Sequence, residues 1–90
     1  MMVTLETRYK KNDTIMYKEL ADGPALIDPY RRTMTSLNDT ALEVWRLLDG
    51  ERSVLDIINA MRDIFETDEG HLKKDVLDFL KEMLKREMIR

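Results

Sequence analysis

The strongest fold signal in the chain is the segment Leu37-Asn38-Asp39-Thr40-Ala41-Leu42-Glu43-Val44-Trp45-Arg46-Leu47-Leu48-Asp49-Gly50. It opens as the end of a strand and passes through a residue suited to cap a helix, either Asn38 or, two residues later, Thr40 paired with Glu43. Apolar residues then recur at helical spacing, at Ala41, Val44, Trp45 and Leu48. Gly50 is placed to end the helix. The segment predicts a helix that buries the only tryptophan of the chain.

Two further helices are predicted downstream. Ser53, with Asp56 three residues later, is placed to cap the first. Its apolar stripe comprises Val54, Ile57, Ile58, Met61, Ile64 and Phe65. The acidic segment 67–70 opens the second, because carboxylates favour a helix N-terminus. Its stripe comprises Leu72, Val76, Phe79, Leu80 and Met83.

Upstream, three short segments favour strands, at residues 15–20, 25–28 and 33–37. Asp22-Gly23-Pro24 supplies a turn between the first two, and Pro29 ends the second. Such short connections imply an antiparallel meander. Residues 1–13 are mixed and polar, so we expect a loop or a frayed, flexible end there. The prediction for residues 1–90 is one α+β domain with a winged-helix-like arrangement, a three-stranded antiparallel sheet followed by three helices.

The composition restricts the cellular setting and the partners. The chain has 90 residues, no cysteine and a net charge of −3. It therefore has no disulfide framework and no thiolate metal site, and a reducing cytoplasm suits it. The sequence shows no signal peptide and no apolar run near the ~18–20 residues of a membrane span. A negative net charge does not favour nucleic acid or an anionic membrane.

The sequence holds no recognisable catalytic motif. His71 is the only histidine and has only scattered carboxylates as possible partners in a metal site. Asp49, Glu51, Asp75 and Asp78 suit a solvated surface better than an acid–base pair. With three glycines in all, the chain has no phosphate-binding loop. We therefore expect no enzyme activity, no metal and no cofactor.

The predicted third helix carries a basic outer face formed by Lys73, Lys74, Lys81, Lys85 and Arg86. Asp75, Asp78, Glu82 and Glu87 interleave with these bases. The face suits an acidic peptide or DNA, and it also suits a plain solvated surface.

The order of these motifs resembles the PqqD family of small peptide-recognition domains from ribosomal peptide modification pathways. The resemblance rests on Leu26-Ile27-Asp28-Pro29, on Leu37-Asn38-x-Thr40-Ala41-x-x-Val44-Trp45-x-Leu47-Leu48-Asp49-Gly50, on Ser53-Val54-x-x-Ile57 and on Asp75-x-x-x-Phe79-Leu80. It covers residues 15–90. It implies a three-stranded sheet packed on three helices. It also implies binding of the leader segment of a precursor peptide, with delivery to a modifying enzyme that is often a radical S-adenosylmethionine enzyme.

In this family the peptide adds as a strand beside the third strand and lies against the third helix. Carried over to this chain, the resemblance implies a peptide-binding edge and a helical groove wall. The edge comprises Arg32, Thr33, Met34, Thr35, Ser36 and Leu37, and the wall comprises Lys73, Val76, Leu77, Leu80, Lys81 and Leu84. The family often has a Gly-Arg-Tyr-Tyr-like entry to this strand, whereas this chain has Arg32-Thr33-Met34-Thr35. That departure implies a different side-chain specificity and leaves open whether the product is pyrroloquinoline quinone or another modified peptide.

A winged-helix DNA-binding regulator is the alternative from another functional class. Its recognition helix normally brings several Lys or Arg residues to the phosphates. Here the predicted second helix has Arg62 as its only base. The sequence therefore favours peptide recognition.

Overall fold

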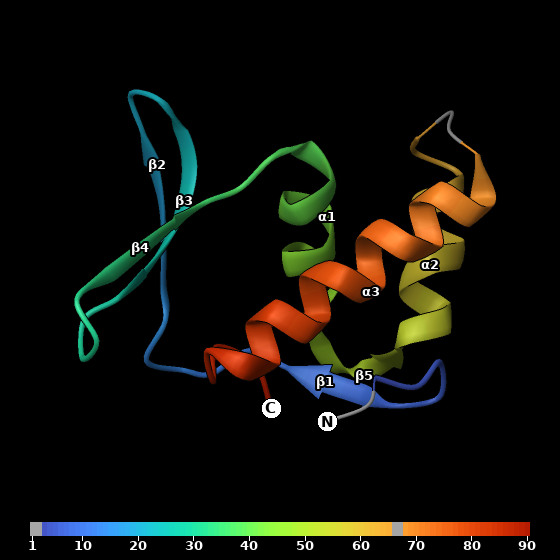
Figure 1. Ribbon diagram of the computed structural model, residues 1–90, viewed down its shortest axis with the longest axis horizontal. Helices are drawn as coiled ribbons and strands as arrows, with labels where there is room; N and C mark the ends of the chain where they lie inside the picture. The colour runs from blue at the N-terminus through green and yellow to red at the C-terminus, as the bar shows by residue number, and fades with distance from the viewer. Residues whose placement is uncertain (1–2, 66–67) are drawn as a thin grey trace.

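The computed structural model describes residues 3–65 and 68–90, and this part of the chain forms two small sheets and three helices (Figure 1). In chain order the elements are β1 (Arg8–Lys10), β2 (Met16–Leu20), β3 (Gly23–Asp28), β4 (Thr33–Ser36), α1 (Asp39–Leu47), β5 (Asp49–Ser53), α2 (Val54–Arg62) and α3 (Glu69–Lys85). The predicted α+β class, with its three-stranded antiparallel sheet and three helices, is confirmed.

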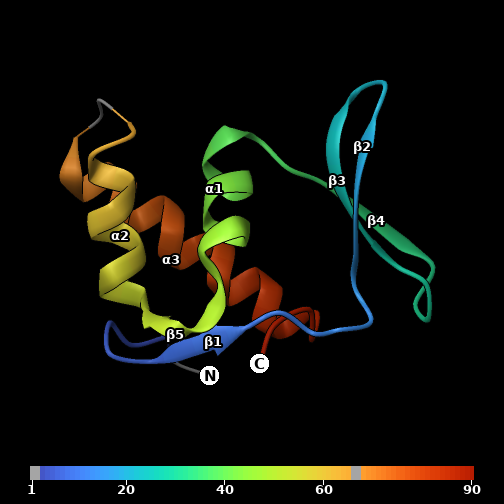
Figure 2. The ribbon, with the colours of Figure 1, turned by 180° about the vertical axis from the view of Figure 1, so that it is seen from behind.

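The larger sheet has the strand order β2-β3-β4, with both pairs antiparallel. It stands to one side of the helices and joins α1 through the short segment 37–38, while α3 runs diagonally across the helical part (Figures 1 and 2). The central strand β3 places Leu26, which is fully buried, against the core. This sheet therefore projects from the core and leaves its two outer strands with one neighbour each.

Side-chain caps begin the three helices. The Oδ1 atom of Asn38 accepts a hydrogen bond from the Ala41 N–H at 2.8 Å, so Asn38 caps α1 rather than Thr40. Ser53 and Asp56 form a capping box at α2, because each side chain accepts from the other residue's backbone N–H. Asp68 caps α3 by accepting from the His71 N–H at 3.2 Å. Thr67, the first residue of the segment expected to open this helix, lies outside the described residues.

The core joins one face of each helix to β3. Trp45 is 5% exposed, and Val44, Ile57, Val76 and Leu80 are fully buried. The predicted stripes are buried except at three positions. Ile64, which is 55% exposed, and Phe65 lie beyond the end of α2 at Arg62, and Phe65 and Phe79 are only partly buried. Burial of these side chains supplies most of the folding free energy, at about 1.5–3 kcal/mol for each large apolar residue.

The prediction of a loop or frayed end over residues 1–13 is wrong for residues 8–11. Strand β1 pairs with β5, and its Tyr9 side chain is buried. On its other side, Lys10 exchanges two backbone hydrogen bonds of 2.9 Å with Arg90, and Lys11 bridges to Ile89. The N-terminal segment is therefore held between β5 and the C-terminus. Sequence patterns miss it because its partners lie about 40 and 80 residues away along the chain.

Gly50 has a different role from the predicted helix stop. Helix α1 ends at Leu47, and Gly50 lies within β5 with a φ of +82°. A Cβ atom at Gly50 would lie 3.3 Å from the Cβ of Lys10 on β1. Glycine therefore permits both the left-handed backbone and the close approach of the two strands.

Candidate functional site: the open edge of strand β4

Strand β4 forms one edge of the three-stranded sheet. It pairs with β3 through Ala25↔Ser36, Leu26↔Thr35, Ile27↔Met34 and Asp28↔Thr33, and the strand order gives it no second neighbour. An edge strand of this kind presents a row of backbone N–H and C=O groups that another extended chain can satisfy.

The register shows which backbone groups point outward. The Leu37 N–H donates to the Pro24 carbonyl at 2.9 Å, so Pro24 and Leu37 form a hydrogen-bonded pair. Such pairs alternate with non-bonded pairs along an antiparallel ladder. Thr35 and Thr33 therefore bond to β3, whereas the N–H and C=O groups of Met34 and Ser36 point toward the open edge.

The two faces of β4 also differ. Met34 is 60% exposed and lies in one row with Ile27 and Met16 on the outer face of the sheet. Thr35 shares its row with the buried Leu26, so it faces the helices. Arg32, in the turn before β4, is exposed and adopts a φ of +55°. A strand added beside β4 would therefore send alternate side chains outward and toward α3.

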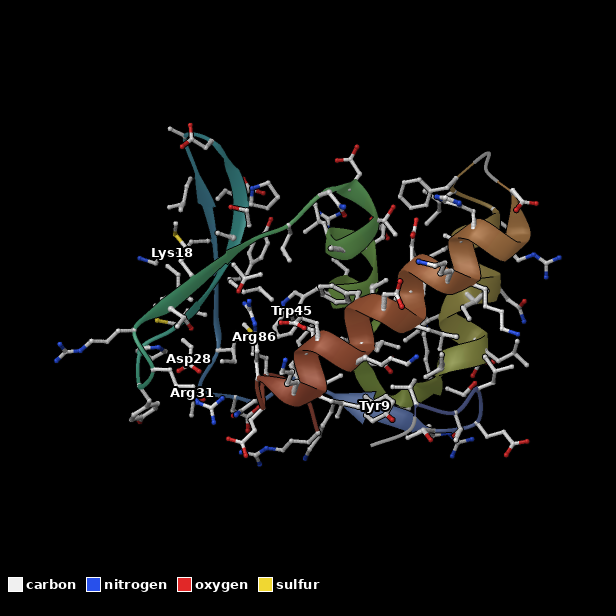
Figure 3. All side chains as sticks on the ribbon, in the orientation of Figure 1. Tyr9, Lys18, Asp28, Arg31, Trp45 and Arg86 are labelled. Atoms are coloured by element: carbon white, nitrogen blue, oxygen red, sulfur yellow. The ribbon has the colours of Figure 1, made fainter. Side chains whose placement is uncertain are left out.

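Arg86, the C-cap of α3, reaches this inner face. Its Nη1 atom donates to the Oγ1 of Thr35 at 2.6 Å, and its Nε atom donates to the Oε1 of Glu82 at 3.0 Å. The Arg86 carbonyl accepts a hydrogen bond of 2.6 Å from Arg31, which also forms an ion pair with Glu87. Figure 3 shows Arg86 between the sheet and α3. The β3–β4 turn and the end of α3 are thereby fixed against each other.

A pocket of about 190 Å³ continues the site beyond the end of β4. It lies between the start of α1 and the middle of α3 and is lined by Asn38, Thr40, Ala41, Asp75, Asp78 and Phe79. Asn38 follows Ser36 by two residues, so the pocket begins about 7 Å along the chain from the strand. We call this space the α1–α3 pocket.

The residues expected from the family resemblance do not all lie at this edge. Thr33, Met34, Thr35 and Ser36 form β4 itself. Leu37, Val76 and Leu80 belong to the buried core, with exposures of 6%, 0% and 0%. A peptide reaches these three only if the core opens.

The other four residues of the expected helical wall lie on a different side of α3. At 100° per residue, Leu77 is two and a half turns from Arg86 and points the opposite way. Lys73, Lys81 and Leu84 lie within about 40° of Leu77. By this helical geometry, the four residues Lys73, Leu77, Lys81 and Leu84 face away from the side of α3 that carries Arg86.

The face of α3 toward β4 and α1 instead carries Asp75, Phe79, Glu82 and Arg86, at spacings of four, three and four residues. Sequence analysis included Phe79 in the core stripe and treated Asp75 and Glu82 as solvated residues. It placed Arg86 on the basic outer face, which suits an acidic peptide, DNA or a plain solvated surface. The partial burial of Phe79 marks where the core stripe gives way to this face. The helical spacing links the four residues, but the sequence does not state which side of α3 meets the sheet.

Charged groups near the site are paired and exposed. A side-chain hydrogen bond to Asp78, 3.0 Å long, is the main cause of a raised pKa at Lys74. His71 Nε2 lies 3.8 Å from Asp75. Within residues 3–65 and 68–90, no group of three or more His, Cys, Asp and Glu side chains is arranged to hold a metal ion. No helix in this described part is long and apolar enough to cross a membrane.

Comparison with known proteins gives a family match over most of the chain. Residues 25–89 match the family model described as coenzyme PQQ synthesis protein D (PqqD). A PqqA binding protein of Azotobacter vinelandii (strain DJ / ATCC BAA-1303) is 37% identical over 60 residues, which is 67% of this chain and 64% of the relative. A PqqA binding protein of Pseudomonas paraeruginosa (strain DSM 24068 / PA7) is 41% identical over 51 residues, or 57% of this chain and 54% of the relative. The matches thus span less than two thirds of these relatives.

Two solved structures share the fold. One is lasso peptide synthetase B1 complexed with a leader peptide, with a TM-score of 0.78, 18% identity, and coverage of 92% of this chain and 98% of the other. The second is TbiB1 in complex with the TbiA(beta) leader peptide, with a TM-score of 0.75, 21% identity, and coverage of 90% and 94%. At these identities the likeness concerns the fold.

Proposed function

This chain belongs to the PqqD family, and we propose that it binds the leader segment of a ribosomally made precursor peptide as a strand added to β4. It then presents the peptide to a modifying enzyme, of the radical S-adenosylmethionine class or another class, in pyrroloquinoline quinone synthesis or a related pathway. The single observation that carries the proposal is the open edge of β4, with the backbone groups of Met34 and Ser36 directed outward.

Strand addition explains how so small a surface binds a peptide. Main-chain hydrogen bonds supply affinity, and side-chain contacts on alternate residues supply specificity. The inner face offers Thr35, Phe79 and Arg86, and the outer face offers Met34 beside Ile27. The names of the A. vinelandii and P. paraeruginosa relatives support PqqA as a first peptide to test.

Chemistry is assigned to the partner enzyme rather than to this chain. We assign catalysis in this way because the sequence has one histidine, His71, and no recognisable catalytic motif. We also expect the protein and its peptide to meet in the cytoplasm, where precursor peptides are made. A DNA-binding function is disfavoured because α2 carries Arg62 as its only base and the net charge is −3.

The test is a calorimetric titration of the PqqA peptide of A. vinelandii into three proteins: the parent, Ser36→Pro and Glu19→Pro. Proline at Ser36 deletes an outward N–H of β4. Glu19 is the matched control, because the register with β3 directs its N–H toward the opposite edge of the same sheet. We expect saturable binding to the parent and to Glu19→Pro, with binding lost in Ser36→Pro. Equal binding to all three proteins would refute strand addition on β4, and no binding to the parent would refute PqqA as the peptide.

A further inference from the structure

Arg86 is held in place through both its backbone and its side chain. Its backbone N–H donates to the Glu82 carbonyl at 3.1 Å, and its carbonyl accepts from Arg31. Its side chain, 43% exposed, spans from Glu82 on α3 to Thr35 on β4. A long side chain fixed in this way loses little further conformational entropy when it binds a ligand.

This guanidinium keeps unused hydrogen-bond donors. It has five N–H groups, and its two side-chain bonds use Nε and one hydrogen of Nη1. It forms no further hydrogen bond to any residue that the structure describes. The free Nη edge has the planar fork geometry that matches a carboxylate.

The register places this fork beside the next strand position. Thr35 faces the helices, so the residue of an added strand directly opposite Thr35 faces them too. Its Cβ would lie about 4.5–5.5 Å from the Cβ of Thr35. An Asp or Glu side chain at that position reaches the guanidinium already bonded to Thr35 Oγ1.

The two ends of the site differ in charge. The α1–α3 pocket, beyond the end of β4, is lined by Asp75 and Asp78. These carboxylates repel an acidic side chain placed there, whereas Arg86 attracts one placed opposite Thr35. The Glu82 carboxylate that now pairs with Arg86 is itself 48% exposed, so water screens that pair and it competes weakly.

We infer that Arg86 is a specificity-determining residue, which selects leader peptides with Asp or Glu at the position opposite Thr35. This inference rests on the proposed strand addition and adds the chemical class of the peptide. It assigns Arg86 to the peptide site, where the basic residues Lys73 and Lys81 had been expected.

The experiment is a selection from a displayed random dodecapeptide library on the full chain and on Arg86→Gln and Arg86→Glu. On the parent, the selected peptides should share an acidic residue at one fixed position. Arg86→Gln should lose this preference, and Arg86→Glu should replace it with Lys or Arg. A merely structural role for Arg86 would not reverse the sign of the preference.

A direct titration then measures the coupling between Arg86 and the acidic residue of the peptide. One peptide selected on the parent is compared with its Glu→Gln or Asp→Asn version. The amide version should bind the parent about tenfold more weakly or worse, and Arg86→Gln should bind both versions equally. An equal loss on both proteins overturns the inference, and so does a parent selection without an acidic consensus.

The Ser36→Pro variant separates this inference from the proposed function. Ser36→Pro should bind none of the selected peptides. If Ser36→Pro binds them as well as the parent, or if the parent selects nothing, strand addition fails and the inference fails with it. If Ser36→Pro loses them but the peptides show no acidic preference, only the role of Arg86 fails. Thermal melting checks that the Arg86 variants fold, and Arg86→Lys, which keeps the charge without the fork, should give an intermediate preference.

Discussion

At the scale of single residues, the fold depends on a few side chains whose environment is clear. Trp45 was expected in the core from the spacing of its apolar neighbours, and it is 5% exposed there. The ammonium group of Lys11 lies 5.6 Å from the centre of its ring. Lys11 also belongs to the segment that pairs with the C-terminus, so Trp45 links α1 to that segment.

Trp45→Ala should lower the free energy of unfolding by about 3–5 kcal/mol, because the truncation leaves a large cavity among α1 and its neighbours. Lys11→Ala is the control, since Lys11 is half-buried and removal of its cation–π contact costs only about 0.5–2 kcal/mol. Urea denaturation of the three proteins measures both effects. A variant at Trp45 that unfolds at the parent's midpoint would show that this side chain does not support the core.

The capping box of α2 makes stability depend on pH. Hydrogen bonds from the backbone and side chain of Ser53 lower the pKa of Asp56 below its ordinary value of 3.8. A lowered pKa in the folded state stabilises the fold above the unfolded pKa, and that stabilisation is lost as the pH falls through the folded pKa. Asp56→Asn should therefore be less stable than the parent at neutral pH and nearly equal to it near pH ~2. A difference that stays constant or grows in acid, in urea melts at both pH values, would contradict this.

At the scale of elements, the sequence predicted those whose signals are local. The caps at Asn38 and Ser53 and the apolar stripes located the helices, and turn residues such as Asp22 and Gly23 located the meander. Strands β1 and β5 escaped prediction because they are short and polar and pair across about 40 residues. The side of α3 that meets β4 escaped too, because it depends on how the helix is rotated against α1 and the sheet, which is a tertiary property.

Strand β1 should contribute to global stability although it was expected to be frayed. Tyr9 is 8% exposed and packs in the core cluster, so Tyr9→Ala should cost about 3 kcal/mol. Arg8→Ala, at the exposed neighbouring position, should change stability by less than about 0.5 kcal/mol. If both variants melt together with the parent, β1 is not part of the cooperative unit.

Two proline variants on β4 should behave differently although they are adjacent. Thr35 donates its N–H toward β3, so Thr35→Pro removes a ladder bond and should cost about 1–3 kcal/mol. Ser36 donates toward the open edge, so Ser36→Pro should melt close to the parent and lose peptide binding instead. Thermal melts and binding titrations on both variants check the pair. The reverse pattern would show that Thr35, rather than Ser36, directs its N–H toward the open edge.

At the scale of the whole molecule, the two sheets have separate roles. The β1–β5 pair closes one end of the helical core, and β1 also bonds to the C-terminal residue Arg90 (Figure 2). The β2-β3-β4 sheet projects from that core and keeps β4 open while Arg31 and Arg86 fix its position against α3. A sheet whose β4 edge is open and lies beside the end of α3 suits a protein that holds an extended peptide for another enzyme.

Amide hydrogen exchange along β4 tests strand addition of the peptide most directly, because it reports each backbone N–H donor separately. In the free protein, Thr35 and Leu37 should exchange slowly, since their N–H groups bond to β3, and Met34 and Ser36 should exchange quickly. Saturation with a bound leader peptide should slow Met34 and Ser36 and leave Thr35 and Leu37 nearly unchanged. If the peptide binds but protects the amides of α2 or of Asp49–Ser53 while Met34 and Ser36 stay fast, strand addition on β4 is contradicted.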